Sequence, residues 1–356
     1  MNFRKRVKSL RIKLKMFGAD AFVTNFSSDL KYFVNFNGSN GVCIITKDKI
    51  LFATDYRYEI VAKKNVVADK IIISLGNLFE EISKESKLKK INILVDKSKF
   101  SLENYFSLKK LFLPKKIITE HSIVEEISSQ KDLEEIKLIK SAIAISEKVF
   151  YKILDIIKPG ITENEIAAEI TYLHKKYGAD KDSFEPIVAS GVNGAKPHAG
   201  ASNKKIKNNE MITLDFGCFY KNYSSDITRT IAIGKPKNEL LKIYNIVNEA
   251  LEIGINEIAI GKKTFEIDKK SRDFIEQKGY GKFFKHSLGH GIGLQIHELP
   301  RISQLSKSKI MIGNVVTIEP GIYLPQIGGV RIEDDVLVLK NKIEVLTKIK
   351  KELIVL

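Results

Sequence analysis

Residues 212–230, with the sequence ITLDFGCFYKNYSSDITRT, are the stretch that decides the fold of the second half of this chain. Two β-prone runs in this stretch each carry an aspartate, Asp215 and Asp226. A hairpin centred between Tyr220 and Lys221 would make the two aspartates direct cross-strand partners, with Cβ atoms about 4.5–5.5 Å apart. Two buried anions at that distance repel each other unless a positive charge lies between them. We therefore predict a strand pair that brings two carboxylates to one cation-binding site.

Glu319 and Glu333 repeat this arrangement further along the chain. They are fourteen residues apart and symmetric about Gln326, and Pro325 and Gly328 mark a turn between them. A residue that precedes a proline is biased toward extended backbone, which suits Glu319 to the end of a strand. The sequence thus predicts a second hairpin that places two more carboxylates together.

A single histidine, His290, completes this set. It is flanked by Gly289, Gly291 and Gly293, which allow the backbone to approach neighbouring groups closely. Four carboxylates and one imidazole match the charge of two divalent cations, so the pattern indicates a two-metal hydrolytic centre. A ligand set dominated by carboxylates favours Mn²⁺, with Zn²⁺ or Co²⁺ as alternatives.

Each of these residues alone has a structural explanation. Asp226 could be a solvated acid beside a strand, Glu333 could pair with Arg331, and His290 could be a buried histidine with satisfied hydrogen bonds. These explanations must hold for all five residues at once and in two matched hairpins. The metal-centre hypothesis explains them together.

Composition limits the remaining possibilities. A chain of 356 residues with 44% hydrophobic content predicts two domains with sizeable cores. No stretch approaches the roughly 18 apolar residues of a membrane span. The basic segment Met1–Lys8 is not followed by a long apolar region, so it makes a poor signal peptide. We expect instead an amphipathic first helix with a solvated basic face. Its apolar positions are Val7, Leu10, Ile12, Leu14 and Met16.

The cysteines and the charge indicate a cytoplasmic protein without a nucleic-acid partner. Cys43 and Cys218 both lie in apolar strand-like runs and are too few for a disulfide framework, so we predict reduced core residues. The net charge is +16, but the lysines are spread along the whole chain and no nucleic-acid-binding motif accompanies them.

The first domain, residues 1–125, alternates helix and strand patterns and is predicted to be α/β. A hairpin is expected over 41–46 and 50–54, closed at Lys47-Asp48-Lys49. Ser101 is a suitable N-cap for the last predicted helix. The predicted helices cover residues 4–16, 55–63, 77–87 and 101–112, and the other predicted strands cover 21–24, 71–73 and 91–95.

The second domain, residues 126–356, follows a polar stretch at 120–132. It begins with an amphipathic helix of about 25 residues that ends before Pro159-Gly160. A second helix starts near Thr162, with Glu163 and Glu165 in its first turn. From residue 184 onward strand patterns dominate, interrupted by helical patterns near 237–259 and 264–277. This order predicts an α+β domain with a mostly antiparallel sheet.

These motifs resemble the M24-type metallopeptidases of the pita-bread fold, which include aminopeptidase P, prolidase and methionine aminopeptidase. Asp215, Asp226, His290, Glu319 and Glu333 stand in the order of that family's five ligands. The N-terminal part resembles the creatinase/prolidase-type domain through two stretches. These are Tyr32-Phe33-Val34-Asn35-Phe36-Asn37-Gly38-Ser39 and Thr54-Asp55-Tyr56-Arg57-Tyr58.

The resemblance implies a role for each ligand. Asp215 would chelate one metal, Asp226 and Glu333 would bridge both, and His290 and Glu319 would complete the other site. A hydroxide that bridges the two metals would attack the peptide bond. Glu319 would carry a proton from that water toward the leaving nitrogen.

The resemblance also implies functions for residues that are not ligands. His198 would lie near the scissile bond and stabilise the tetrahedral intermediate or assist the leaving group. His297 would face the substrate carbonyl. His286 lies four residues before His290 and matches the family pattern in that loop more weakly. Arg331 would form a salt bridge with a ligand carboxylate and orient it. The other two histidines, His121 and His174, are predicted to be ordinary surface or helix residues.

Three features favour the Xaa-Pro branch of this family. The contexts Pro197-His198-Ala199 and Ile296-His297-Glu298 resemble that branch. The chain has an additional N-terminal domain of about 125 residues, and Arg331 lies two residues before Glu333, as in aminopeptidase P and prolidase. The expected activity is hydrolysis of the bond between an N-terminal residue and a following proline. An Xaa-Pro dipeptidase (prolidase) is the alternative, because the sequence does not show which cation could hold a free substrate carboxylate. The resemblance further implies a homodimer.

Two other classes are disfavoured. Creatinase-like members use the fold without metal, and non-enzymatic pita-bread domains bind peptides or histones. Both tend to lose the metal ligands, whereas this chain retains all five.

Overall fold

The computed structural model describes residues 1–356, and the chain divides into two compact units, Met1–Ser128 and Ser129–Leu356. The sequence placed the boundary after residue 125, which lies inside helix α6 (Ile123–Ser128). That helix contacts α1 (Phe3–Phe17), and the Ile123 amide donates to the Asp96 carboxylate at 3.1 Å. The helix is therefore part of the first unit.

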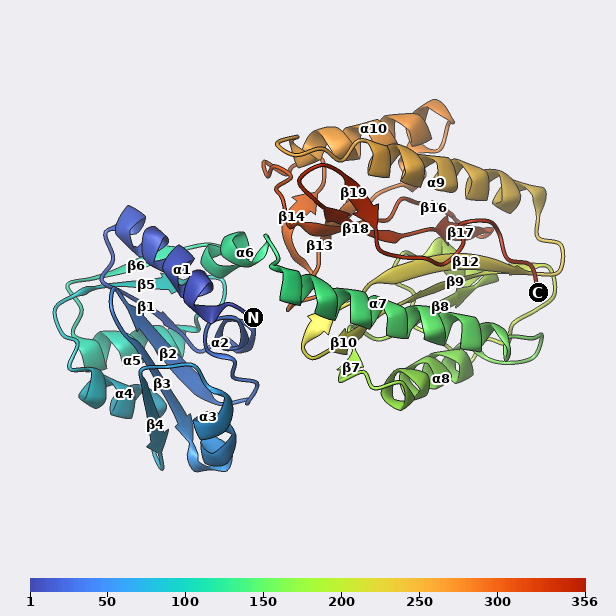
Figure 1. The fold of residues 1–356 in the computed structure, drawn as a ribbon. Coiled ribbons are helices and arrows are strands. Elements are labelled where there is room, and N and C mark those ends of the chain that lie inside the picture. Colours follow the sequence, from blue (N-terminus) through green and yellow to red (C-terminus); the bar gives the residue numbers. More distant parts are fainter. The chain divides into compact units, whose positions relative to one another are not determined.

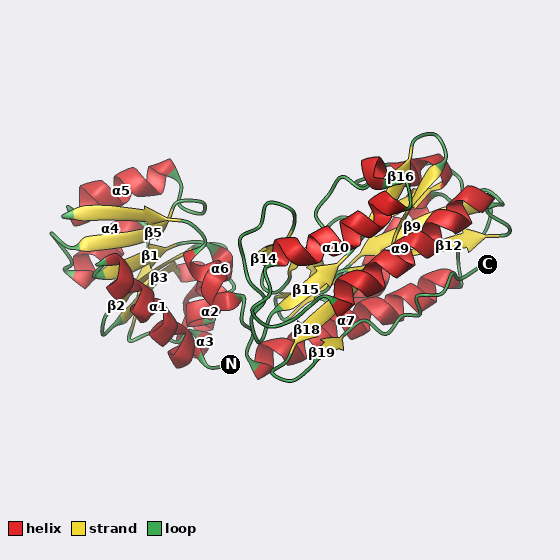
Figure 2. Cartoon of the chain, turned by 90° about the horizontal axis from the view of Figure 1, so that it is seen from above, coloured by secondary structure: helices red, strands yellow, loops and turns green.

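The first unit is a six-stranded sheet with helices on both faces (Figures 1 and 2). Helices α4 (Leu78–Ser86) and α5 (Leu102–Phe112) pack on one face, and α1 and α2 (Ser27–Val34) lie on the other. Strand β2 is antiparallel to both of its neighbours, and the other pairs are parallel. The strand order is β4 (Lys70–Ser74), β3 (Ile50–Asp55), β2 (Gly41–Thr46), β1 (Ala21–Thr24), β5 (Asn92–Asp96) and β6 (Lys116–Glu120).

The predicted elements of this unit are present, with local differences. The 41–54 hairpin and the Ser101 cap occur as expected, and the Ser101 hydroxyl accepts from the Asn104 amide. The helix expected over 55–63 is a 3₁₀ turn, η1 (Tyr56–Tyr58), followed by α3 (Glu59–Asn65). The sequence analysis did not predict α2, β6 or α6.

The buried face of α1 is narrower than predicted. Val7, Leu10 and Leu14 are buried, whereas Ile12 and Met16 are 57% and 73% exposed. Positions i, i+3 and i+7 share one side of a helix, and positions 12 and 16 fall on the opposite side. The apolar residues at 12 and 16 were therefore wrongly placed in the core.

The second unit has its antiparallel strands between two pairs of helices. In Figure 1, α7 (Leu133–Leu154) and α8 (Glu163–Lys176) lie on one side of the strands, and α9 (Asn238–Asn256) and α10 (Thr264–Gln277) on the other. Helix α7 begins at a capping box formed by Asp132 and Glu135 and is three residues shorter than the expected 25. Helix α8 begins at a second capping box, between Thr162 and Glu165.

The strands of this unit form four small sheets, and all of their ladders are antiparallel, as predicted. The first contains β12 (Ile227–Ile233), β9 (Glu210–Phe216) and β8 (Ile187–Ser190). The second contains β11 (Tyr223–Ser224), β10 (Cys218–Tyr220) and β7 (Lys181–Asp182). The third contains β14 (Glu298–Ile302), β13 (Gly289–Gly291), β15 (Val315–Ile318), β18 (Asp334–Val338) and β19 (Ile343–Val345). The fourth pairs β16 (Gly321–Leu324) with β17 (Gly328–Arg331).

The register of the first hairpin differs from the prediction. Asp215 lies opposite Thr228, not opposite Asp226. The turn is centred one residue later than expected, because Lys221 and Asn222 both adopt positive φ, at 48° and 69°. Two successive residues with positive φ are the mark of the tight turns that close two-residue hairpins, and asparagine tolerates that conformation well. The two aspartates are therefore diagonal neighbours on one face rather than direct partners.

The second hairpin has the predicted register. Ile318 pairs with Asp334 on one side of the site and Gly321 with Arg331 on the other. Both pairs are symmetric about residue 326, so Glu319 lies opposite Glu333.

The two cysteines are core residues, as predicted. Cys43 and Cys218 are free and buried, and burial raises the pKa of both thiols, as expected for inert core residues.

None of the helices combines the length and the apolar character that crossing a bilayer requires.

Candidate metal centre

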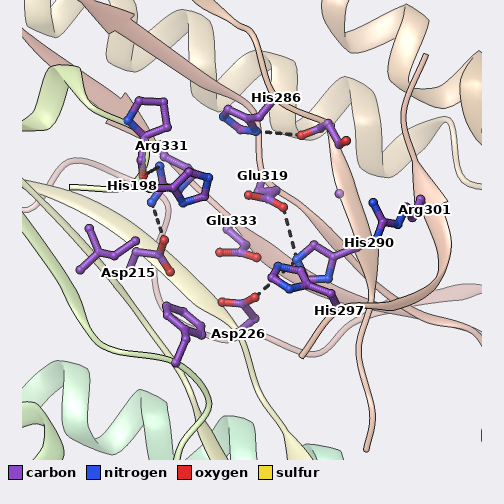
Figure 3. Close-up of a pocket in the computed structure, with 15 residues that line it drawn as sticks. His198, Asp215, Asp226, His286, His290, His297, Arg301, Glu319, Arg331 and Glu333 are labelled. Carbon is purple, nitrogen blue, oxygen red and sulfur yellow. Dashed lines mark hydrogen bonds and ion pairs between the residues drawn. The ribbon is translucent and has the colours of Figure 1, made fainter. Parts of the chain in front are cut away.

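The predicted ligands surround one cavity of about 400 Å³ in the second unit (Figure 3). The carboxylates of Asp215, Asp226, Glu319 and Glu333 converge on its centre in that view. The lining residues are Phe184, Ile187, Pro197, His198, Asp215, Asp226, His286, Ser287, Gly289, His290, His297, Arg301, Glu319, Arg331 and Glu333. All residues that the sequence indicated for the site therefore lie together.

The five predicted ligands lie within short strands or directly beside the end of a strand. Asp215 is on β9, Asp226 immediately precedes β12, and His290 is the central residue of β13. Glu319 and Glu333 lie where the second hairpin passes from one sheet to another, between β15 and β16 and between β17 and β18. The antiparallel ladders thus hold the cluster without any ligand on a long loop.

The distances within the cluster suit a shared cation. His290 Nε2 lies 3.6 Å from Asp226 Oδ2 and 3.5 Å from Glu319 Oε1. Asp226, His290 and Glu333 each offer one ligand atom, and these three atoms all lie within 4.8 Å of one another. Glu319 and Asp215 border this trio on the cavity wall.

Two of the carboxylates present one satisfied and one unsatisfied oxygen. Asp215 Oδ2 accepts from the Arg331 guanidinium, and Glu333 Oε2 accepts from the Thr228 hydroxyl at 2.7 Å. Asp215 Oδ1 and Glu333 Oε1 are buried and have no protein partner. A buried oxygen without a donor is unfavourable and rare, so its partner is expected to be a bound group. These residues fit a divalent metal centre.

The electrostatics of the cluster favour added positive charge, either protons or a cation. Burial, reinforced by neighbouring carboxylates, raises the pKa of Asp226 and of Glu333 well above the usual range. Burial raises the pKa of Glu319 to about 8. A divalent cation would reverse this effect by stabilising the ionised forms.

His290 is prepared as a neutral ligand. Burial lowers its pKa to about 3, so the imidazole is uncharged at neutral pH. Its Nδ1–H donates to the Gly291 carbonyl at 3.1 Å, which leaves the Nε2 lone pair directed at the carboxylates.

The glycines around His290 allow its strand to lie unusually close to its neighbours. A Cβ on Gly289 would lie 1.9 Å from the Thr317 carbonyl oxygen, and one on Gly291 would lie 2.3 Å from that of Leu299. No side chain fits at either position. The prediction that these glycines permit a close backbone approach is confirmed.

Arg331 connects the cluster to further residues around the cavity. Besides the ion pair with Asp215, it donates from Nη1 to the Tyr323 hydroxyl at 2.6 Å and to the Pro197 carbonyl at 3.2 Å. His286 Nδ1–H donates to the Ser287 carbonyl, so its Nε2 accepts from the Tyr323 hydroxyl at 2.9 Å. The predicted ion pair between Arg331 and a ligand carboxylate is present.

His198 and His297 lie on the cavity wall on opposite sides of the carboxylates in Figure 3. The His297 ring is edge-on to the His290 ring, with centroids 4.4 Å apart. His198 is exposed at the tip of the 191–201 loop. Both can therefore reach a molecule bound in the cavity.

Three residues that contribute to the site were not predicted from the sequence, and the prediction for one histidine was incomplete. Thr228 and Tyr323 carry no signal as isolated hydroxyl groups, and Arg301 carries none among many basic residues, although all three lie at the site. His174, which was grouped with surface or helix residues, is on a helix but fully buried, and its Nδ1 is 2.6 Å from Asp182 Oδ1. His121 is exposed, as predicted.

An α+β unit that presents carboxylates and a neutral imidazole to one cavity is the architecture of the pita-bread metallopeptidases. Residues 137–340 match the model of metallopeptidase family M24, and residues 6–127 match that of the creatinase/prolidase N-terminal domain. The chain belongs to metallopeptidase family M24.

Relatives span the whole chain. The Bacillus subtilis peptidase YqhT is 38% identical over 352 residues, which are 99% of this chain and 100% of the relative. The solved Xaa-Pro dipeptidase from Bacillus anthracis is 41% identical, covers 100% of both chains and superposes with a TM-score of 0.95. The solved X-Pro aminopeptidase from Thermotoga maritima is 37% identical, covers 96% of this chain and 99% of its own, and has a TM-score of 0.89.

Proposed function

We propose that this protein hydrolyses the peptide bond between an N-terminal residue and a following proline. The observation that carries the proposal is the pair of buried, unpartnered oxygens on Asp215 and Glu333, which face a cavity that also holds His198 and His297. Relatives of known structure that are named Xaa-Pro dipeptidase and X-Pro aminopeptidase support the proline specificity.

The proposed cofactor is a pair of divalent cations, with Mn²⁺ preferred over Zn²⁺ or Co²⁺ for this oxygen-rich set. Asp215, Asp226, His290, Glu319 and Glu333 would hold them. Two such cations supply Lewis-acid polarisation of a carbonyl and the activation of water at neutral pH.

The protein's own groups would perform the proton transfers. Glu319 lines the cavity, and its Oε1 lies 3.5 Å from His290 Nε2, so its carboxylate would lie beside a water held by the cations. Glu319 would therefore accept a proton from the attacking water and deliver it toward the proline nitrogen. That nitrogen has no hydrogen of its own, so departure depends on protonation.

The histidines and the apolar lining would position the substrate. His297, beside His290, would orient the scissile carbonyl, and His198 would stabilise the developing charge near the leaving nitrogen. Half-buried Phe184, Ile187 and Pro197 line the same cavity and offer an apolar surface for the proline ring.

Arg301 favours an Xaa-Pro dipeptidase as the second candidate function. Its side chain lines the cavity, is exposed, and has no ion pair or hydrogen bond within the protein. A free guanidinium at that place can bind a substrate carboxylate with two parallel hydrogen bonds. In a dipeptide, the C-terminal carboxylate lies on the proline itself, next to the scissile bond.

A peptide panel with added Mn²⁺ separates these candidates. It includes Xaa-Pro, Xaa-Pro-Yaa, Met-Ala-Xaa and Leu-Gly-Xaa peptides, with release of the first residue as the readout. Cleavage confined to the first two supports the proposal, and their ratio decides between dipeptidase and aminopeptidase. Equal cleavage of the proline-free peptides contradicts the proline specificity. Full activity after treatment with a chelator contradicts the requirement for a metal.

We also propose that residues 1–125 act as a creatinase/prolidase-type domain and that the protein is a cytoplasmic homodimer. The two free, buried cysteines support a reducing compartment. Sedimentation analysis of the full chain tests the dimer, and a monomer at micromolar concentration contradicts it.

A further inference from the structure

Glu163 is a fully buried carboxylate with an unusual number of donors. It is the first residue of α8 and has 0% exposure. Its Oε1 accepts from the Ser190 amide at 2.8 Å, the Ser190 hydroxyl at 2.7 Å and the Asn193 side-chain amide at 3.1 Å. Its Oε2 accepts from the same Asn193 amide at 3.1 Å, the Ser202 amide at 3.2 Å and the Ser202 hydroxyl at 2.6 Å.

These donors lie at the two ends of one segment. Ser190 and Asn193 precede His198, and Ser202 follows it. One carboxylate therefore fastens both ends of the loop whose tip carries His198. The backbone reinforces the attachment at the second end, because the Asn164 amide donates to the Ser202 carbonyl at 3.0 Å.

The middle of the loop is also attached at Gly194 and at Pro197. A Cβ on Gly194 would lie 3.2 Å from the Gly329 amide, so the backbones pack closely there. Arg331 donates to the Pro197 carbonyl at 3.2 Å. The His198 side chain makes no hydrogen bond within the protein, so the loop alone determines where the imidazole lies.

We propose that Glu163 is a positioning residue for catalysis, because it holds the 190–202 loop in the shape that places His198 over the metal cluster. An acid in the first turn of a helix ordinarily stabilises the helix through its dipole. Both carboxylate oxygens of Glu163 instead accept hydrogen bonds from the 190–202 loop, which lies outside α8. The inference rests on the proposed function, in which His198 contacts the substrate.

The test uses the full chain with Glu163 replaced by glutamine, E163Q. The glutamine NH₂ would face three donors in place of an acceptor, so at least one end of the loop loses its attachment. We expect kcat for an Xaa-Pro peptide to fall about 10- to 100-fold, since small displacements of a positioned group have effects of that size. The matched control is E165Q, two residues further along the same helix, where the carboxylate accepts only from the amide and hydroxyl of the Thr162 cap. It should change kcat less than about twofold.

A double-mutant cycle separates positioning from general destabilisation. If Glu163 acts through His198, then E163Q should have less than about a twofold effect on kcat in an H198A background. Multiplicative effects of the two changes would overturn the inference. The Kd for Mn²⁺ should be the same in E163Q and wild type, whereas a change of tenfold or more would show that the metal cluster itself was disturbed.

Hydrogen exchange gives a readout independent of activity. Amides of 190–202 should exchange at least tenfold faster in E163Q than in wild type or E165Q, while those of β9 and β12 remain unchanged. Equal exchange in the loop would overturn the inference. If E163Q does not fold, S202A removes the hydroxyl that donates to Oε2 and accepts from the Lys204 amide, and it should produce the same pattern with smaller amplitude.

The proposed function and this inference fail in different ways. An inactive wild-type protein on all proline peptides contradicts the proposed function, and the loop-ordering role is then decided by hydrogen exchange. An active wild type with unaltered kcat in E163Q contradicts the inference alone.

Discussion

The Thr228 hydroxyl donates to Glu333 Oε2 at 2.7 Å, while the other oxygen of the same carboxylate is buried without a partner. In this carboxylate, one oxygen has a hydrogen-bond donor and the other has none. The protein holds one oxygen of Glu333 with a hydrogen bond and leaves the other oxygen for a bound cation. Asp215 follows the same rule, with Arg331 in the place of Thr228.

Metal removal should destabilise the protein more at higher pH. In the metal-free state, burial raises the pKa of Asp226, Glu333 and Glu319, the last to about 8. The folded chain then holds protons that the unfolded chain has released, so its free energy of unfolding falls as pH rises from about 4.5 toward 8. Metal binding removes this penalty and adds roughly 3 kcal/mol at a hundredfold excess over Kd.

Calorimetry with and without a chelator measures this effect. We expect the difference in Tm between the two forms to widen steadily from pH 5 to pH 8. A difference that stays constant or narrows over this range would contradict the coupling between the carboxylates and the metal.

The change D226N should separate activity from stability. An asparagine keeps the size of the side chain but cannot supply two anionic oxygens to a shared cation. We expect kcat to fall by at least about 10² and Mn²⁺ binding to weaken, because one charged ligand is lost. The Tm of the metal-free protein at neutral pH should stay the same or rise, since a buried asparagine is neutral without the proton uptake that the buried Asp226 carboxyl needs. D155N, at an exposed helix end, serves as the control. Retained hydrolysis in D226N would show that Asp226 is not a ligand.

The Lys131–Glu298 ion pair should be important for the stability of the second unit. The two groups are 2.8 Å apart and only 1% and 2% exposed, and Glu298 also accepts from the Gln295 amide at 2.9 Å. K131M leaves a buried carboxylate without its cation and should reduce the free energy of unfolding by about 3–5 kcal/mol.

Urea denaturation of a double-mutant cycle checks this value. Adding E298Q to K131M should recover part of the loss, because the uncompensated charge disappears. K137M breaks an exposed pair on α7 with Glu134 and should have little or no effect. An equally small effect of K131M would mean that the buried pair contributes nothing.

Arg301 should determine the preference for dipeptides. If its guanidinium binds the free carboxylate of an Xaa-Pro dipeptide, R301M loses a charge-assisted interaction worth about 1.5–3 kcal/mol. We expect kcat/KM to fall about 10- to 150-fold for the dipeptide and much less for its C-terminal amide. K307M removes an exposed cation from the following loop, outside the cavity, and should leave both values unchanged. Equal losses for acid and amide would contradict a carboxylate-binding role.

The ligands could be predicted from the sequence, whereas the register of the first hairpin and the hydrogen-bond partners of the ligands could not. The second hairpin could be placed because Glu319 precedes a proline and the turn glycines fix a symmetric register. The first could not, because its turn depends on positive φ at Lys221 and Asn222, and lysine gives little sign of that conformation. A shift of one residue in the turn moved the partner of Asp215 from Asp226 to Thr228.

The partners of the ligands depend on contacts between distant segments. Thr228 and Glu333 are 105 residues apart, and Arg331 and Asp215 are 116 apart. A lone threonine or tyrosine has no spacing pattern that could identify such contacts. Glu163 shows the same difficulty, since its position in a first helical turn predicts a dipole interaction and conceals its six hydrogen bonds to the His198 loop.

The most direct test of the metal centre is an anomalous difference map, recorded at the manganese edge from crystals of the full chain grown with Mn²⁺. Two peaks should lie in the cavity, roughly 3.5–4 Å apart, with oxygens of Asp226 and Glu333 touching both. A map with no peak among the five residues, or with one peak held elsewhere, would contradict a two-metal centre in this protein.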